Sequence, residues 1–319
     1  MKAIGYRLSA FGLFAAAALA PGAAEAQSQL LVISGLAGEP RFEQEFGQWG
    51  KTLVDAAAGK FGMRADQIVW LADKPAADPQ RIDGRSTKVE VERVMREMAQ
   101  RAGPTDRVLV VIMGHGASDG EGARLNLSGP DLSADELAKL LDLFPTQRVV
   151  VVNTTSSSGD FQQPLAGKNR SIVTATRSGA ERNETVFGKY FVASLTGDGA
   201  DTDKDGRTTI LEAYQFAQRE VERHYKDANH LQSEHSVIGG DQELARGFYL
   251  AAATSAPTTA ANAEVRALIE QRQQIEGRIE ALRARRATMQ AADYDRQLEE
   301  LVVELALKNR EIRQKEGSQ

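Results

Sequence analysis

Apolar residues recur along residues 27–254 in two alternating patterns. Short apolar runs predict buried strands at 30–34, 67–72, 107–113, 148–152, 171–176 and 248–252. Between most of them, apolar residues spaced three and four apart predict helices at 41–61, 86–102, 133–144, 184–195 and 209–228. Strands joined by helix-length crossovers predict a mostly parallel α/β sheet with helices on both faces.

Polar residues mark several of these boundaries. Ser86 is placed to cap the helix that follows it, and Ser133 with Glu136 has the spacing of a capping box. Residues 123–127 predict a small hairpin between the strand at 107–113 and the next helix.

The two ends of the chain have different patterns. Residues 1–26 combine a basic start, an apolar run of 13 residues and the small-residue signal Ala24-Glu25-Ala26, which predicts a signal peptide cut between Ala26 and Gln27. The mature protein is then expected to be periplasmic or secreted. No other stretch is long and apolar enough to predict a membrane span.

The C-terminal part predicts a helical hairpin. Residues 255–263 are rich in Ser, Pro, Thr and Ala, as in a linker, and residues 264–319 carry apolar residues at heptad-like spacing with a break near 291–293. A coiled-coil-like hairpin can serve as a spacer or a cap on the domain, or as an arm for self-association or a partner protein. The sequence leaves these roles open.

Composition removes several classes of function. The 319 residues have a net charge of −5 and no basic block, so nucleic-acid binding is not expected. The hairpin is balanced, with 11 basic and 11 acidic residues. The chain has no cysteine, which excludes disulfides, thiolate metal sites and a cysteine nucleophile.

The candidate catalytic residues lie in the loops that follow two of the predicted strands. The strand at 107–113 runs into Gly114-His115-Gly116, and flanking glycines let the backbone turn and expose the imidazole. The strand at 148–152 runs into a loop of small hydroxyl residues, 153–160. In open α/β sheets, functional groups gather beyond the carboxyl ends of the strands. His224, His230 and His235 have no comparable setting.

These two loops resemble those of the legumain (asparaginyl endopeptidase) and caspase-like peptidases. In that family the first strand delivers the catalytic histidine and the second a cysteine followed closely by Ser-Gly. Aligning that pair with Ser158-Gly159 places Ser156 at the cysteine position, about 40 residues after His115. The resemblance covers residues 29–253 and implies a caspase-like fold, a peptidase activity and an oxyanion hole that includes the Gly116 N–H.

The resemblance also implies a substrate pocket. The segment after the strand at 171–176 helps to wall it in the legumain family, which makes Arg177 and Ser178 candidate substrate contacts. Arg41, after the first strand, is a weaker candidate for the same wall. A basic wall would favour acidic or amide side chains in a peptide substrate or ligand.

Serine in place of cysteine divides the functional hypotheses. A serine hydroxyl is far less acidic than a thiol and needs a histidine oriented by a carboxylate. Asp119, Glu121 and Asp160 are near in sequence, but none is assigned to that role. The favoured hypothesis is a pseudopeptidase that binds peptides or protein partners in the old cleft. The alternatives are an active peptidase using His115 and Ser156, and a calcium-stabilised structural module.

Residues 201–212 match the twelve-residue calcium loop of an EF hand. Carboxylates stand at positions 1, 3, 5 and 12, glycine at 6, and an apolar residue at 10. The predicted ligands are the side chains of Asp201, Asp203, Asp205 and Glu212, the carbonyl of Arg207 and a water held by Thr209. A single loop of this kind predicts a structural Ca²⁺ site.

Overall fold

The computed structural model describes residues 26–197, 199–202 and 206–250 and, with gaps, residues 268–316. The signal peptide predicted at 1–26 lies outside the described residues except for Ala26. The predicted linker at 255–263 lies outside them entirely.

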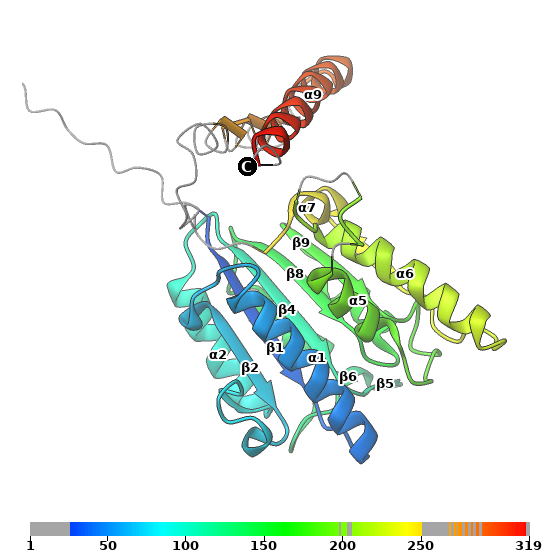
Figure 1. Ribbon diagram of the computed structural model, residues 1–319. Helices are drawn as coiled ribbons and strands as arrows, with labels where there is room; N and C mark the ends of the chain where they lie inside the picture. Colours follow the sequence, from blue (N-terminus) through cyan, green and yellow to red (C-terminus); the bar gives the residue numbers. More distant parts are fainter. Residues whose placement is uncertain are drawn as a thin grey trace, which may run out of the picture.

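A seven-stranded sheet runs through the centre of the domain (Figure 1). Its order is β10-β9-β8-β4-β1-β2-β3, and every pair is parallel except β10 with β9. The strands are β1 (Ser28–Ser34), β2 (Ile68–Ala72), β3 (Gly84–Arg85), β4 (Arg107–Met113), β8 (Arg148–Asn153), β9 (Arg170–Thr174) and β10 (Val237–Gly240). This confirms the mostly parallel α/β sheet that the alternating pattern predicts.

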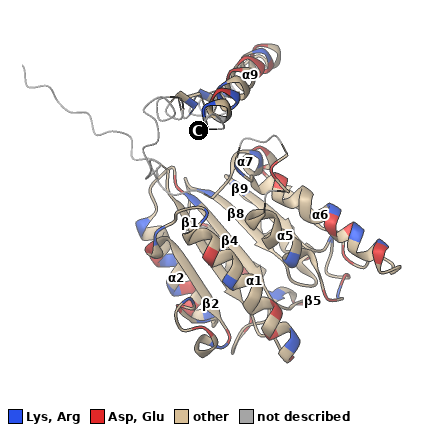
Figure 2. Cartoon of the chain, viewed as in Figure 1, with Lys and Arg blue, Asp and Glu red and all other residues tan. Residues whose placement is uncertain are grey.

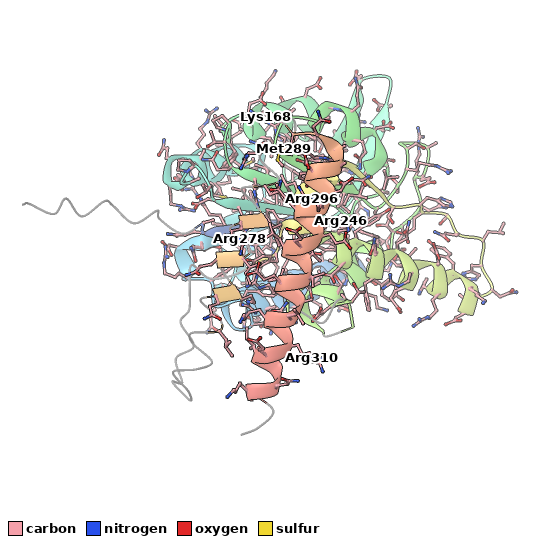
Figure 3. All side chains as sticks on the ribbon, turned by 90° about the horizontal axis from the view of Figure 1, so that it is seen from above. Lys168, Arg246, Arg278, Met289, Arg296 and Arg310 are labelled. Atoms are coloured by element: carbon pink, nitrogen blue, oxygen red, sulfur yellow. The ribbon has the colours of Figure 1, made fainter. Side chains whose placement is uncertain are left out.

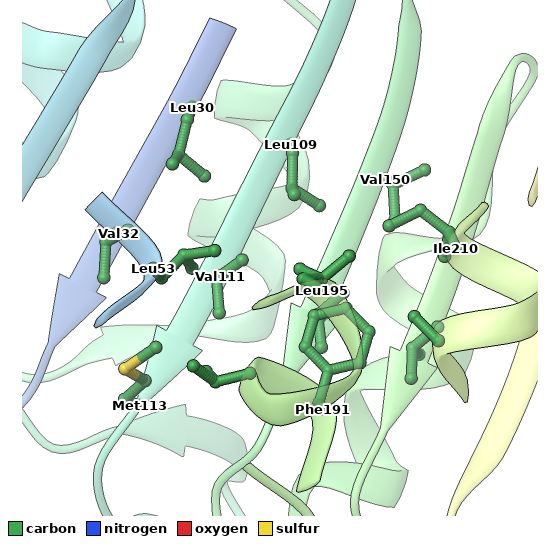
Figure 4. Packing of buried hydrophobic residues seen from close by; sticks show 14 of the residues in the cluster. Leu30, Val32, Leu53, Leu109, Val111, Met113, Val150, Phe191, Leu195 and Ile210 are labelled. Carbon is green, nitrogen blue, oxygen red and sulfur yellow. The ribbon is translucent and has the colours of Figure 1, made fainter. Parts of the chain in front are cut away.

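Helices cover both faces because alternate strand residues point to opposite sides of the sheet. One buried cluster joins Leu30, Leu109 and Val150 to α1 (Pro40–Ala58), α5 (Phe187–Thr196), α6 (Ile210–Asp227) and α7 (Gln242–Gly247) (Figure 4). The other cluster joins the intervening strand residues to α2 (Lys88–Arg101), α3 (Ala134–Leu141) and α4 (Gln162–Leu165). Short 3₁₀ helices lie at Ala65–Gln67, Pro75–Ala77 and Ser158–Phe161.

A second, antiparallel sheet follows the carboxyl end of β4. It contains β5 (Gly116–Asp119), β6 (Gly122–Leu125) and β7 (Leu132–Ser133) in that order. The hairpin expected at 123–127 is therefore present but begins earlier. After β7, Ser133 and Glu136 form the predicted reciprocal capping box of α3.

Two boundary predictions are wrong. Thr87, and not Ser86, caps α2 by accepting a hydrogen bond from the Glu90 N–H. Ser86 lies one residue before the cap position and is fully buried. No strand forms at 248–250, and residues 251–252 lie outside the described part. Within the described residues the last strand is β10, whose two glycines weaken its apolar signal in the sequence.

The C-terminal segment has a small apolar core of its own. Ile275, Ile279 and Leu282 pack with Tyr294 and Leu301 of α9 (Ala291–Glu316), drawn apart from the sheet in Figure 1. Arg278, labelled in Figure 3, pairs with Glu304 of α9 at 2.9 Å. These contacts agree with the predicted hairpin. Its role in self-association or partner binding stays a prediction.

Charged residues fall mainly on the helices and loops, whereas the central strands carry few of them (Figure 2). Within the described part of the chain, no helix is long and apolar enough to cross a bilayer.

Two glycines of α1 differ in what surrounds them. A Cβ at Gly50 would lie 2.3 Å from Cζ2 of Trp70, which is 1% exposed and donates its indole N–H to Ser34 Oγ at 2.9 Å. A Cβ at Gly47 would meet nothing within 4 Å. Packing therefore requires glycine at position 50 and not at position 47.

We expect Gly50→Ala to lower the free energy of unfolding by about 1 kcal/mol or more, because overpacking outweighs the gain in helix propensity. Gly47→Ala, the matched control, should raise it by about 0.5–1 kcal/mol. Urea unfolding of both variants checks this. A Gly50→Ala protein as stable as Gly47→Ala would contradict the packing argument.

Candidate functional site

The candidate site lies where β1, β4 and β8 end side by side. Ser34 pairs with Met113, and Ile112 with Asn153, so the loops that follow the three strands leave the sheet together. Gly114 has φ +147°, and a Cβ there would lie 3.2 Å from Gly35 Cα. Only glycine fits this turn, which delivers His115 from β4 into the space above β1 and β8.

His115 is held by a backbone carbonyl and two aromatic rings. Its Nε2 lies 3.1 Å from the carbonyl oxygen of Ala37. Because a carbonyl can only accept, Nε2 must carry the proton, and the neutral ring keeps Nδ1 as its acceptor. Phe42 and Phe46 of α1 meet the imidazole edge-on, with ring centroids 4.5 and 5.5 Å away.

The loop after β8 is fixed by its own hydroxyl groups. Thr154 donates to the Ile112 carbonyl at 2.8 Å, and Thr155 donates to Asn153 Oδ1 at 2.8 Å. Ser158 accepts from the Thr176 N–H at 3.1 Å and is fully buried. Ser156 differs because it is 8% exposed and lines a pocket.

Ser157 carries strain next to Ser156. Its φ of 56° and ψ of 14° are left-handed, which is uncommon for a residue with a side chain. The surrounding chain holds it there, since its N–H donates to the Glu181 carbonyl at 2.9 Å and its hydroxyl to the Gly179 carbonyl at 3.1 Å. The loop geometry is thus imposed by the segment after β9.

His115 and Ser156 share one pocket, which we call the His115 pocket. Its lining comes from α1, both strand-end loops and the segment before α5: Phe42, Glu45, Phe46, Gly114, His115, Ser156, Glu184 and Thr185. Its volume is about 10 Å³, room for about one water. Ser156 Oγ donates to the Gly116 carbonyl at 3.2 Å, and among the described residues no hydrogen bond joins Ser156 to His115.

Gly116 packs directly on the Ser156 loop. A Cβ at this position would lie 2.6 Å from Thr155 Oγ1 and 2.7 Å from the Ser156 carbonyl oxygen. The structure therefore brings Gly116 to Ser156, as the resemblance implies. The role of its N–H in an oxyanion hole stays a prediction.

The acids near His115 in sequence do not lie beside it. Asp119 pairs with Arg124 at 2.7 Å, and Asp160 accepts from Ser118 and from the Gly179 N–H. With Glu121 they line a separate pocket. The carboxylates that line the His115 pocket are Glu45 and Glu184, which no sequence motif marks.

Neither of these two carboxylates orients the imidazole. Glu184 Oε2 pairs with Arg41 Nη1 at 3.0 Å, and Arg41 also stacks on Phe42 with its Cζ 4.1 Å from the ring centroid. In the described residues His115 has no hydrogen bond to a carboxylate. Arg41 is not a lining residue of the His115 pocket but contacts two residues that are, Phe42 and Glu184; its role in a substrate pocket stays a prediction.

The structure does not bring Arg177 and Ser178 into the His115 pocket. The Arg177 side chain is 68% exposed and lies 3.6 Å from Glu181, and the backbone of 177–178 packs on Gly159. Glu181 also accepts from the Arg177 and His235 N–H groups at 3.0 Å and from His235 Nδ1 at 2.7 Å. Burial would raise the Glu181 pKa, but these donors bring it below its usual value.

Glu234 holds the start of α5, at the end of the segment 177–187. Its carboxylate, 1% exposed, accepts from the Val186 N–H at 2.7 Å and the Phe187 N–H at 3.1 Å, at the start of α5. Burial raises its pKa to about 7, although both N–H bonds oppose the shift. Glu234 and His235 thus fix the segment that carries Glu184 and Thr185. Sequence reasoning missed both because they lie in a loop without a motif.

The predicted calcium loop is described in part. Asp201 Oδ2 accepts from the Gly206 N–H at 3.0 Å, and Gly206 has φ +86°. The Glu212 carboxylate is 8% exposed and accepts from the N–H and hydroxyl groups of Thr202 and Thr209 at 2.8–3.0 Å. Asp203 and Asp205 lie outside the described residues, and no group of three metal-ligating side chains occurs within them.

Comparison with known proteins gives a family match over this region. The model of the peptidase C13 family matches residues 82–246, a little more than half of the chain, including His115 and Ser156. No curated protein matches the sequence.

Two solved structures illustrate the structural matches. A protein from Geobacter sulfurreducens has 14% identity and a TM-score of 0.45, with 69% of this chain and 96% of that chain covered. drICE has 11% identity and a TM-score of 0.40, with 68% of this chain and 89% of that chain covered.

The Glu234 carboxylate makes the domain sensitive to pH. A pKa raised from 4.5 to about 7 means that the fold favours the protonated form, so its contribution is complete below pH 4.5 and is lost as pH rises toward 7. Relative to Glu234→Gln, the wild type should lose free energy of unfolding over this window, on the order of 3 kcal/mol at most.

Chemical unfolding from pH 4 to 8 measures this difference. Glu243→Gln, at a half-exposed position, is the matched control and should leave the profile unchanged. Parallel profiles for wild type and Glu234→Gln would show that the Glu234 carboxyl does not titrate in this way.

Proposed function

This chain belongs to the peptidase C13 family, and we propose that it is a member that binds peptides without cutting them efficiently. The observation that carries the proposal is the group that orients His115. It is the carbonyl of Ala37, 3.1 Å from Nε2, and not a carboxylate.

The distinction between carbonyl and carboxylate decides which nucleophile His115 can serve. A serine nucleophile must give its proton to the imidazole, and a carboxylate stabilises the imidazolium that forms. A neutral carbonyl orients the ring but contributes no negative charge. A thiol, with a pKa near 8.5, needs far less help from the base. The arrangement suits a cysteine, and position 156 holds a serine.

The local geometry of Ser156 supports the same proposal. Its hydroxyl donates to the Gly116 carbonyl at 3.2 Å, away from a base. The His115 pocket has room for about one water, so a peptide must displace lining side chains such as Glu184, which is paired with Arg41. Binding a peptide or protein partner is compatible with this cleft, whereas rapid turnover is not.

Cleavage of a fluorogenic peptide library by residues 27–319 tests the proposal. We expect the wild type and Ser156→Ala to be silent, and Ser156→Cys to gain activity at least about tenfold above background because the thiol ionises more readily. Adding His115→Ala to Ser156→Cys should remove that gain.

Turnover by the wild type that is lost in both Ser156→Ala and His115→Ala would overturn the proposal and establish a serine peptidase. If Ser156→Cys is also silent and no library peptide binds the wild type, the structural module becomes the better account.

We propose in addition that residues 201–212 bind Ca²⁺ as a structural clip in an exported protein. Asp201 and Glu212 supply carboxylates at positions 1 and 12, and the Asp201 bond to the Gly206 N–H closes the tight turn that such loops need. The Arg207 guanidinium stacks on Tyr249, with its Cζ 4.3 Å from the ring centroid. At position 7 of the loop, Arg207 would therefore bind the ion through its backbone carbonyl. Arg107, the first residue of β4, stacks on the same ring at 4.5 Å.

Thermal unfolding with calcium, magnesium or a chelator tests the site. Calcium at 100 times its dissociation constant should stabilise the wild type by about 2.7 kcal/mol, and Asp201→Asn and Glu212→Gln should lose most of this gain. Magnesium is the control ion. An unchanged midpoint in 10 mM calcium (about ten times the weakest affinity of such loops) would rule out the clip.

A further inference from the structure

A second pocket adjoins the His115 pocket, and we call it the Trp70 pocket. It lies at the carboxyl ends of β1 and β2 and is walled by Phe46, Trp70, Ala72 and Ile82. Its volume is about 50 Å³. Since one water needs roughly 10–15 Å³ by the same measure, the space fits about three or four water-sized groups, the size of a valine or leucine side chain.

The two pockets share walls. Phe46 lines both of them, and its ring centroid lies 5.5 Å from that of His115. Ala37 lines the Trp70 pocket, while its carbonyl accepts from the His115 ring. A chain bound over His115 therefore lies beside a wall that the two pockets share.

Gly47 is a lining residue of the Trp70 pocket that packing does not explain. It lies within α1, where glycine costs roughly 1 kcal/mol relative to alanine, and it lines the pocket. Gly50, one turn later, is explained by Trp70, but a Cβ at Gly47 would meet no atom within 4 Å. Packing does not require glycine here, and a longer side chain would enter the free space.

The polar groups of the pocket are already satisfied. The Trp70 indole N–H donates to Ser34 Oγ at 2.9 Å, and Lys74 Nζ pairs with Glu43 at 2.5 Å. Asp73 accepts from the Ser128 hydroxyl and pairs with Arg85 at 3.5 Å. A charged or amide side chain would find no free partner among these groups and would lose its water. An aliphatic side chain would bury apolar surface against apolar walls.

We propose that the Trp70 pocket receives an aliphatic side chain of the peptide bound at His115. The peptide as the source of that side chain rests on the proposed function, whereas the preference of the pocket for an aliphatic group does not. The pocket would then select leucine- or valine-sized residues beside the position over His115.

The test follows the indole resonances of Trp49 and Trp70 in the full mature chain by NMR. The probes are N-acetyl-leucine methylamide, N-acetyl-aspartate methylamide and N-acetyl-glycine methylamide, and Trp49→Phe assigns the Trp70 signal. We expect only the leucine probe to shift the Trp70 resonance saturably. Gly47→Leu should weaken its binding by about tenfold or more, because the new side chain fills the space.

Gln48→Leu is the matched control, since it adds the same side chain at an exposed position of the same helix and should leave binding unchanged. Thermal unfolding verifies that each variant is folded. Equal shifts from the aspartate probe, no shift from the leucine probe, or full binding by a folded Gly47→Leu would each overturn the proposal. This readout needs no catalysis and no peptide at His115. It therefore tests the preference of the Trp70 pocket for an aliphatic group independently of the proposed function.

Discussion

The parallel register of β1, β4 and β8 is the constraint on which the site depends. Because of this register, the three strands end at the same edge of the sheet. Ala37, His115 and Ser156 lie in the three different loops that follow them, and these loops meet at the His115 pocket. The close approach of Gly114 to Gly35 locks the first two loops together. A larger residue at position 114 would press on the backbone of Gly35, and a larger residue at position 35 would press on the Asn126 carbonyl oxygen, 2.5 Å from its Cβ.

Under the proposed function, this geometry belongs to a peptidase fold that keeps its binding site without efficient cleavage. The imidazole, its carbonyl partner and the close packing of Gly116 on the Ser156 loop do not depend on the atom at the nucleophile position. The carbonyl that orients His115 supplies direction without charge, which is sufficient for a thiol and insufficient for a hydroxyl. In the proposed function, one atom at position 156, oxygen in place of sulfur, separates binding from cleavage.

The sequence predicts the fold better than it predicts the site. Long apolar runs such as 107–113 are unambiguous because a buried parallel strand needs them, and the Ser133–Glu136 capping box is a local interaction. The placement of His115 and Ser156 in one pocket follows from the same strand order. Ser86 failed as a cap because two adjacent hydroxyl residues compete for that position.

The sequence could not indicate contacts between residues that lie far apart along the chain. The Ala37 partner of His115 is a backbone atom, which carries no sequence signal. Glu184, Glu234 and His235 act through segments that meet only after the sheet has formed. Arg177 and Ser178, expected in the wall of a substrate pocket, do not line the His115 pocket, whose wall on that side is formed by Glu184 and Thr185.

The most direct test of this account is the thiol pKa of Ser156→Cys, measured from the pH dependence of its alkylation. The chain has no other cysteine, so the signal is unique. The account predicts a midpoint well below about 8.5, the usual value for a thiol, and a return toward that value when His115→Ala is added. A midpoint at or above about 8.5 that does not respond to His115→Ala would contradict it, because His115 and position 156 would then not form a working pair.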